Sequence, residues 1–253
     1  MGLDAEHRGV VMGRLTVTAV PVLNDNYVWL ITDPDSGETA AVDPSVTEPV
    51  LEAVAAQGLR LTQVLNTHWH PDHTGGNRGI KAAIGCTIIA PAEAERVSTV
   101  DRVVSEGDRV TVAGAEAVVW DIPAHTAGHI AFYFENEGMI FVGDTMFAMG
   151  CGRLFEGTAE QMYSNIQRIA DLPGDVRIYC GHEYTLANAR FAAHVEPENE
   201  EVTRRLKQAF AEREAGQITL PTTVAEERAT NPFVRAKNSQ DFAELRTAKD
   251  SFR

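Results

Sequence analysis

The sequence has few cysteines and little positive charge. Its three cysteines, Cys86, Cys151 and Cys180, lie far apart and form no CxxC pair, so neither a disulfide framework nor a cysteine zinc site is indicated. Lys and Arg number 22 against 36 Asp and Glu, which gives a formal net charge of −14 at pH 7. Because proteins bind nucleic acids through clustered positive charge, we expect no nucleic-acid partner.

Long apolar runs are also missing. No stretch approaches the roughly 20 apolar residues that a bilayer-spanning helix needs. The first residues, MGLDAEHRGVVMG, lack the apolar segment of a secretory signal. We therefore expect a cytoplasmic protein without a membrane partner, with Met12 as an alternative start to Met1, and a monomer is the simplest expectation.

The 253 residues, 44% of them hydrophobic, suffice for one large domain with a small appendage. Strand-like segments at 15–20, 27–32 and 39–43 predict an antiparallel meander. Helical and strand patterns then alternate. From residue 186 the strand signals give way to charged helical segments, which open into a Pro- and Thr-containing loop over residues 220–233. We expect a mixed α/β domain over residues 14–185 and a helical domain over residues 186–253.

The alternating segments have recognisable ends. The helical segment 49–58 stops on a glycine, and the helical segment 158–170 begins at Thr158 with Glu160 close behind, a capping pattern. The other segments are the strands 61–68, 86–91 and 175–184, the helix 77–85, one or two strands in 109–123 and a hairpin over 130–144 that turns near Asn136–Gly138.

The segment NTHWHPDHTGGN, residues 66–77, places His68, His70, Asp72 and His73 within six consecutive positions. In an extended segment His68 and His70 share a face and can converge on one ion, while Asp72 and His73 can reach a second. Crowding these groups without a cation would cost desolvation and repulsion. Pro71 biases His70 away from helix, which we expect to hold this loop open. The spacing therefore favours a metal site over a solvent-exposed histidine-rich loop.

Further candidate ligands follow later strands. HTAGH contributes His125 and His129, GDTMF contributes Asp144 and CGHEY contributes His182. Taken singly, each could be a buried histidine bonded to a carbonyl or an aspartate that caps a turn. Their shared placement at strand ends favours a role as partners of the first cluster.

These segments, in this order, resemble the metallo-β-lactamase superfamily, whose fold is an αββα sandwich with a two-metal site along one edge. FAMGCGRLFEGTAEQMY, CGHEYTLANARFAAHVEPEN and EERATNPFVRA resemble more closely the glyoxalase II family, the hydroxyacylglutathione hydrolases. This similarity runs from about residue 15 to the C-terminus.

The resemblance implies a glutathione pocket and a binuclear site for two divalent metal ions. Zinc is the first expectation for these ions, and iron and manganese are alternatives. His129 would support the ligands, and Phe155 stands where some relatives have a tyrosine, so a phenolic hydrogen bond is absent. The residues implied are His68, His70 and His125 for one ion, Asp72, His73 and His182 for the other, Asp144 for both, and Arg153, Tyr184, Arg246 and Lys249 for glutathione.

The implied activity is hydrolysis of S-(2-hydroxyacyl)glutathione, such as S-D-lactoylglutathione, to glutathione and D-lactate in methylglyoxal detoxification. Two adjacent cations make a bridging water acidic enough to give hydroxide near neutral pH and stabilise the oxyanion formed from the thioester. Asp72 would orient the nucleophile and Asp144 would hold the ions together. Arg246 and Lys249 would bind a carboxylate of glutathione, although LRTAKDSFR could instead be a solvated helix face.

Several other activities share parts of this pattern. A glutathione persulfide dioxygenase with a single iron shares HxHxDH, but the C-terminal NPFVRA and RTAK segments oppose it. Another thioesterase of the superfamily, acting on a different thiol carrier, also remains open. A β-lactamase is disfavoured by the helical C-terminus and a ribonuclease-Z-like nuclease by the negative charge. A non-catalytic binding protein would be expected to have lost ligands, whereas all seven positions are filled.

Overall fold

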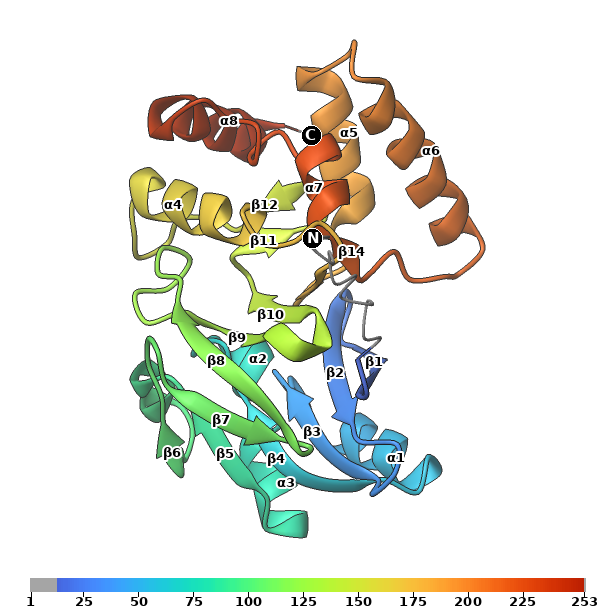
Figure 1. Cartoon of the computed structure of the whole chain (residues 1–253), viewed down its shortest axis with the longest axis vertical. Coiled ribbons are helices and arrows are strands. Elements are labelled where there is room, and N and C mark those ends of the chain that lie inside the picture. Colours follow the sequence, from blue (N-terminus) through green and yellow to red (C-terminus); the bar gives the residue numbers. More distant parts are fainter. Residues whose placement is uncertain (1–12, 253) are drawn as a thin grey trace, which may run out of the picture.

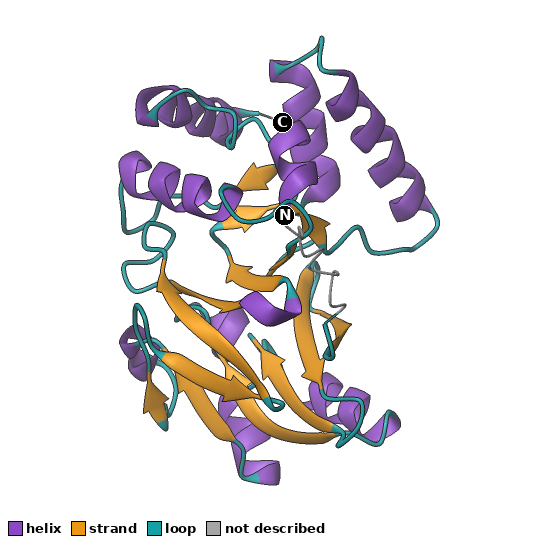
Figure 2. Ribbon diagram, viewed as in Figure 1, coloured by secondary structure: helices purple, strands orange, loops and turns teal. Residues whose placement is uncertain are grey.

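The computed structural model describes residues 13–252, so His7 and the alternative start Met12 lie outside the described chain. Two β-sheets stack face to face, and helices lie on the outer sides of the stack (Figures 1 and 2). The predicted fold class is confirmed: an α/β chain that forms an αββα sandwich and continues into C-terminal helices.

The first sheet begins with the expected antiparallel meander and continues with parallel strands. In sheet order, its strands are β1 (Thr16–Val22), β2 (Asn26–Thr32), β3 (Glu38–Val42), β4 (Arg60–Leu65), β5 (Thr87–Ala90) and β6 (Arg102–Val103). Strand β2 is buried on both faces, because Trp29 and Ile31 join the core between the sheets while Val28 and Leu30 pack toward the outer helices. These outer helices are α1 (Glu48–Ala56) and α3 (Asn77–Ile84).

The second sheet contains the predicted hairpin, which turns at Glu135–Gly138. In sheet order, its strands are β14 (Thr222–Thr223), β13 (Arg177–Cys180), β10 (Met139–Gly143), β9 (Ile130–Phe134), β8 (Ala115–Asp121) and β7 (Arg109–Val112). The loop expected over residues 220–233 instead contains β14 and a helix, residues 224–230. Two residues are too few to show strand alternation, and β14 exists because it pairs with β13.

Helix α4 (Ala159–Ala170) buries Met162, Ile166 and Ile169 completely, at the helical spacing seen in the sequence. Its N-cap is Thr158, as expected, but the reciprocal capping partner is Gln161 rather than Glu160. The third helical residue, not the second, can reach back to the N-cap backbone.

The C-terminal helices are α5 (Thr185–Val195), α6 (Glu200–Glu214), α7 (Val224–Thr230) and α8 (Ser239–Ser251). They lie at the upper end of Figure 1, where α5 packs against α6, and α8 packs against α4. Within residues 13–252, none of the helices combines the length and the apolar character needed to span a membrane. Strand β13 leads directly into α5, so residues 181–184 lie between the sheets and these helices.

Candidate active site

The histidine cluster lies on a tight turn rather than on an open loop. His70 is extended, with φ −55° and ψ 142°, but Pro71 begins a single helical turn, α2 (Pro71–Thr74). The expectation of an open loop was therefore wrong. Proline disfavours helix for the residue before it and suits the first position of a helix, so the chain turns sharply between His70 and Asp72. A Cβ at Gly75 would lie 2.5 Å from the carbonyl oxygen of Ser45, so only glycine allows this packing.

We call His68, His70 and His125 the first half-site. The Nδ1 atom of His70 lies 3.0 Å from Nε2 of His68 and 3.1 Å from Nε2 of His125. The opposite nitrogen of His125, Nδ1, donates to the carbonyl oxygen of Arg153 at 3.0 Å. The His125 lone pair therefore faces the other two imidazoles, an arrangement suited to a shared cation.

We call Asp72, His73 and His182 the second half-site. The Nε2 atoms of His73 and His182 are 3.3 Å apart, and Oδ2 of Asp72 lies 3.5 and 3.4 Å from them. The outer nitrogens, both Nδ1, face carboxylates: that of His73 lies 3.1 Å from Asp43, and that of His182 lies 2.8 Å from Asp25. These carboxylates accept Nδ1–H and so direct the unprotonated Nε2 atoms inward.

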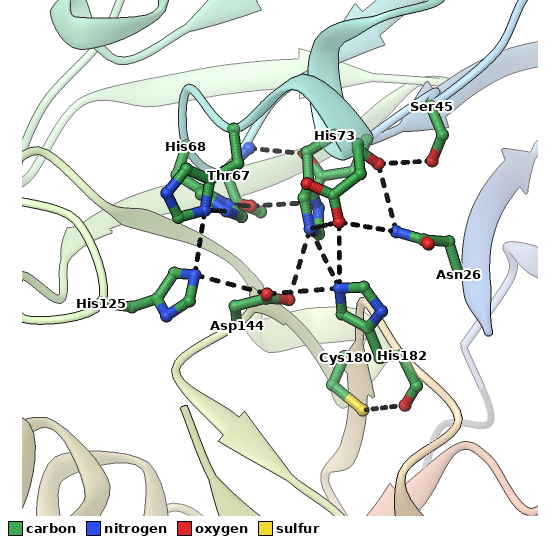
Figure 3. Close-up of polar contacts among 12 residues, drawn as sticks. Asn26, Ser45, Thr67, His68, His73, His125, Asp144, Cys180 and His182 are labelled. Carbon is green, nitrogen blue, oxygen red and sulfur yellow. Dashed lines mark hydrogen bonds and ion pairs between the residues drawn. The ribbon is translucent and has the colours of Figure 1, made fainter. Parts of the chain in front are cut away.

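Asp144 lies between the two half-sites (Figure 3). Its Oδ2 atom is 3.4 Å from Nε2 of His125 and 3.3 Å from Nε2 of His182, while Oδ1 is 3.5 Å from Nε2 of His73. Gly181 permits this approach, because a Cβ there would lie 2.7 Å from Oδ1 of Asp144. Asp144 thus contacts imidazoles of both half-sites, the position that a bridging ligand requires.

The donor atoms of this cluster fit divalent cations. Lone pairs of imidazole nitrogens and carboxylate oxygens converge, and Oδ1 of Asp144 is buried with no hydrogen-bond partner among residues 13–252. A buried carboxylate oxygen without a donor is costly unless a cation faces it. This donor set therefore fits divalent metal ions.

The two half-sites differ in their electrostatics. Burial lowers the pKa of His68, His70 and His125. Burial also opposes protonation of His73 and His182, but the neighbouring carboxylates together outweigh it. Asp144 and Asp43 raise the pKa of His73 well above its usual value, and Asp144 and Asp72 raise that of His182 to about 10. The second half-site therefore stabilises positive charge more strongly than the first.

Asp43 was missed by the sequence reasoning. Together with His68 and His73 it forms another group close enough to hold an ion. Its oxygens are already used, because Oδ1 accepts the Thr67 N–H at 2.8 Å, and Oδ2 accepts the Thr67 hydroxyl at 2.7 Å and faces Nδ1 of His73. Asp43 therefore orients His73. The signal was present, since Asp43 directly follows a strand, as Asp144 does.

His129 has a similar supporting contact. It is fully buried, and its Nε2 atom accepts the backbone N–H of Asp144 at 3.1 Å. The opposite nitrogen of its ring faces the carbonyl oxygen of Ile130 at 3.1 Å. His129 thus fixes the backbone from which the Asp144 carboxylate projects.

A cavity of about 520 Å³ adjoins both half-sites. It is lined by His70, Asp72, His125, Asp144 and His182 of the cluster, by Tyr184, which stacks on His182, and by Arg153, Arg246 and Lys249 among others. The sequence thus anticipated residues that the fold brings to one cavity from β-strand ends and from helix α8.

The cationic residues of this cavity differ in freedom. Arg246 is buried, donates to the carbonyl oxygen of Cys151 at 2.8 Å and pairs with Asp250 at 2.9 Å. Arg153 is largely exposed and lies 3.6 Å from the same Asp250 carboxylate. Lys249 donates to the Ala187 carbonyl oxygen at 3.2 Å. Arg246 is therefore held in place, whereas Arg153 is free to move.

Comparison with known proteins agrees with this geometry. Residues 23–182 match the family model for the "Metallo-beta-lactamase superfamily", and residues 183–252 match that for the "Hydroxyacylglutathione hydrolase C-terminus". Hydroxyacylglutathione hydrolase from Methylococcus capsulatus is 46% identical over 94% of this chain and 99% of its own length. The enzyme of that name from Erythrobacter litoralis is 45% identical over 94% and 100%.

Solved structures share the fold. ETHE1 from Myxococcus xanthus superposes with a TM-score of 0.70 at 26% identity, covering 92% of this chain and 90% of its own. TTHA1623, in a di-iron-bound form, superposes with a TM-score of 0.63 at 21% identity, covering 86% and 99%. On the two family models and the full-length relatives, the chain belongs to the metallo-β-lactamase superfamily and, within it, to the hydroxyacylglutathione hydrolase family.

Proposed function

We propose that this protein hydrolyses S-(2-hydroxyacyl)glutathione thioesters, such as S-D-lactoylglutathione, to glutathione and a 2-hydroxy acid. One observation carries the proposal: a single cavity is lined by the imidazole and carboxylate cluster at one end and by cationic side chains at the other. Because both groups line the same cavity, one extended ligand can meet both. Its relatives of similar length carry the name of this activity.

We propose two divalent ions, one held by His68, His70 and His125 and the other by Asp72, His73 and His182, with Asp144 shared. Zinc suits these ligands, and iron or manganese are compatible with them. When bound, such ions supply an acidified water and polarise a carbonyl oxygen.

The chain's own residues orient the reacting groups. Asp72 and Asp144 both line the cavity, and the carboxylate of either could accept a hydrogen bond from an attacking water. At the other end, Lys249 and Arg246 offer charged donors to a carboxylate of glutathione. Tyr184 stacks on the ring of His182, with 4.7 Å between ring centroids, and so connects the two ends.

The proposed domains carry different parts of the site. The metal cluster lies on residues 14–185, and Arg246 and Lys249, which we propose to bind glutathione, lie on residues 186–253. Helix α5 begins at Thr185, which supports a boundary there. Arg153 and Tyr184 lie on the first of these domains but line the cavity beside α8. The substrate would therefore lie between the two domains.

A thioester panel tests the activity. We expect hydrolysis of S-D-lactoylglutathione without oxygen uptake, slower reaction when the acyl group is attached to cysteine or coenzyme A, and two metal ions per chain by elemental analysis. Rapid turnover of thioesters of another carrier, with little on glutathione thioesters, would contradict the assignment. Oxygen consumption with one iron would instead support the persulfide dioxygenase, which the C-terminal family match does not favour.

A further inference from the structure

The turn between β1 and β2 and the first two residues of β2, Asn26 and Tyr27, lie beside the second half-site. The sequence indicated only a turn here, yet Asp25, Asn26 and Tyr27 each contact that half-site or the residues next to it. Leu23, at the start of this turn, has a φ of 52°, a left-handed conformation that its side chain disfavours. Such a conformation persists only where surrounding contacts stabilise it. The contacts made by residues 25–27 are therefore described one by one.

Asp25 fixes the end of strand β13. Its Oδ1 atom accepts Nδ1–H of His182 at 2.8 Å. Its backbone carbonyl oxygen accepts the N–H of Glu183, also at 2.8 Å. The side chain therefore sets the rotation of the His182 ring, and the backbone sets the position of the chain that carries it.

Asn26 fixes Asp72, another residue that we assign to this half-site. Its side-chain amide donates to Oδ2 of Asp72 at 3.1 Å and to the carbonyl oxygen of Asp72 at 3.2 Å. Asn26 is itself only 5% exposed, so this amide is held rigidly. The Asp72 side chain is far more accessible, and without Asn26 its carboxylate would have more freedom to rotate.

Tyr27 anchors the turn to the same strand end. Its N–H donates to the carbonyl oxygen of Gly181 at 2.8 Å, and its hydroxyl donates to Glu183 at 2.8 Å. Residues 181 and 183 flank His182, so the turn holds this histidine on both sides.

The first half-site has different support. Nδ1 of His68 lies 3.0 Å from the Thr67 hydroxyl, and Nδ1 of His125 bonds to the Arg153 carbonyl oxygen. We propose that Asp25 and Asn26 are positioning residues for the second half-site alone, so that retention of its ion depends on them and retention of the other ion does not. This inference rests on the metal-binding part of the proposed function, not on the substrate.

Metal retention tests the proposal directly. The zinc-loaded full chain is titrated with a chelator, and bound zinc is counted by elemental analysis in the wild type, Asp25→Ala, Asp25→Asn and Asn26→Ala. Asp35→Ala is the matched control, because Asp35 is an exposed aspartate in the neighbouring β2–β3 turn. We expect Asp25→Ala and Asn26→Ala to bind one of two ions about 10–100-fold more weakly, the usual cost of removing such a partner. Asp25→Asn keeps an oxygen that accepts Nδ1–H and should restore part of the affinity.

Two double variants identify the ion that is weakened. Adding His73→Ala to Asp25→Ala should leave the one tight ion in place, whereas adding His70→Ala should weaken the remaining ion as well. Circular dichroism confirms that each variant is folded. Equal weakening of both ions, or retention of both with wild-type affinity in Asp25→Ala, would overturn the proposal. The metal measurement uses no substrate, so it can be interpreted even if the protein fails to hydrolyse the thioester. A wild type that binds fewer than two ions would refute the metal assignment itself.

Discussion

The two ends of the cavity are built in different ways. We call the part lined by the imidazole and carboxylate cluster the metal end. The thiol end, where we propose that glutathione binds, is the part lined by Arg153, Arg246 and Lys249. At the metal end, each imidazole that we assign to the second half-site has an outer nitrogen fixed by a carboxylate, and Asp144 is almost fully buried. At the thiol end, the Arg153 side chain is 66% exposed, and Phe155, which lies between the two ends, is 60% exposed. The metal end is thus organised before any ligand arrives, whereas the thiol end retains side chains that can adjust to one.

Two buried carboxylates show the same contrast. Asp144 is surrounded by imidazoles, so despite burial its pKa is held well below the usual value. Glu227, on α7, is 1% exposed and accepts the Met149 N–H and the Asn231 amide, both at 2.8 Å. Burial raises the pKa of Glu227 to about 7, with hydrogen bonds opposing the rise. The Asp144 carboxylate stays charged beside the imidazoles. The Glu227 carboxyl group instead anchors the hairpin β11–β12 (Met146–Phe147 and Gly150–Cys151) through the Met149 N–H.

Asp144→Asn should have the largest effect, because it removes the one charge shared by both half-sites. We expect kcat to fall by more than about 100-fold, since loss of even an outer partner of a metal ligand costs about 10–100-fold. Metal content should fall in parallel. The measurements are steady-state kinetics and elemental analysis, with the exposed Asp171→Asn as a matched control. Unaltered metal content and activity would favour a non-catalytic role for the cluster.

Glu227→Gln tests, through protein stability, whether burial raises the pKa of Glu227. A carboxyl group whose pKa is raised on folding stabilises the protein below its unfolded value, near 4.5, and this contribution disappears as pH rises through about 7. The glutamine variant lacks this loss. Relative to wild type, its free energy of unfolding should therefore increase by up to about 3 kcal/mol between pH 4 and pH 8.

Urea denaturation at several pH values measures this difference, with the exposed Glu214→Gln as the control. Thr222 donates to Oε1 of Glu227 at 2.7 Å and also lies 3.2 Å from Glu226. A protonated Glu227 can donate to the Thr222 hydroxyl, which then donates to Glu226, and a glutamine amide can do the same. Glu227→Leu removes all these bonds and should destabilise the protein at every pH. A pH-independent difference between Glu227→Gln and wild type would contradict a raised pKa.

The contrast between the ends also explains what the sequence could predict. His68, His70, Asp72 and His73 share one loop, so their spacing alone indicated a metal site, and the ends of buried strands pointed to His125, Asp144 and His182. Asp25 and Asn26 gave no such signal, because a turn rich in Asn and Asp is ordinary. The burial of Arg246 was equally invisible: it depends on α8 packing against Cys151, whereas an Arg in a charged helix predicts exposure.

Lys249→Ala should weaken binding at the thiol end by a smaller factor. Loss of a charge-assisted hydrogen bond costs about 1.5–3 kcal/mol, so we expect KM for S-D-lactoylglutathione to rise about 10-fold or more with kcat nearly unchanged. Lys207→Ala, on the exposed face of α6, is the matched control. An unchanged KM would mean that Lys249 does not contact the substrate.

The pH dependence of KM refines this prediction. Burial, together with the nearby Arg246 and Arg153 guanidinium groups, lowers the pKa of Lys249. Its positive charge is therefore lost at a lower pH than that of an exposed lysine, and KM should rise as pH increases through this value. Lys249→Arg keeps its charge and should lack this component of the rise. Identical KM profiles for wild type and Lys249→Arg would exclude Lys249 as the titrating group.

Phe155→Tyr should have the smallest effect, and it tests whether the bound glutathione contacts residue 155. The Phe155 ring lies 5.2 Å from the ring of His125 and 5.8 Å from that of His70, so its exposed edge faces the cavity between the two ends. A tyrosine hydroxyl there adds a hydrogen bond worth about 0.5–1.5 kcal/mol if it meets the bound thiol, which lowers KM by about 2–10-fold without changing kcat or metal content. Phe210→Tyr, an exposed phenylalanine on α6, is the matched control. An unchanged KM would place the glutathione chain away from Phe155 and confine its recognition to the side of the cavity formed by Lys249 and Tyr184.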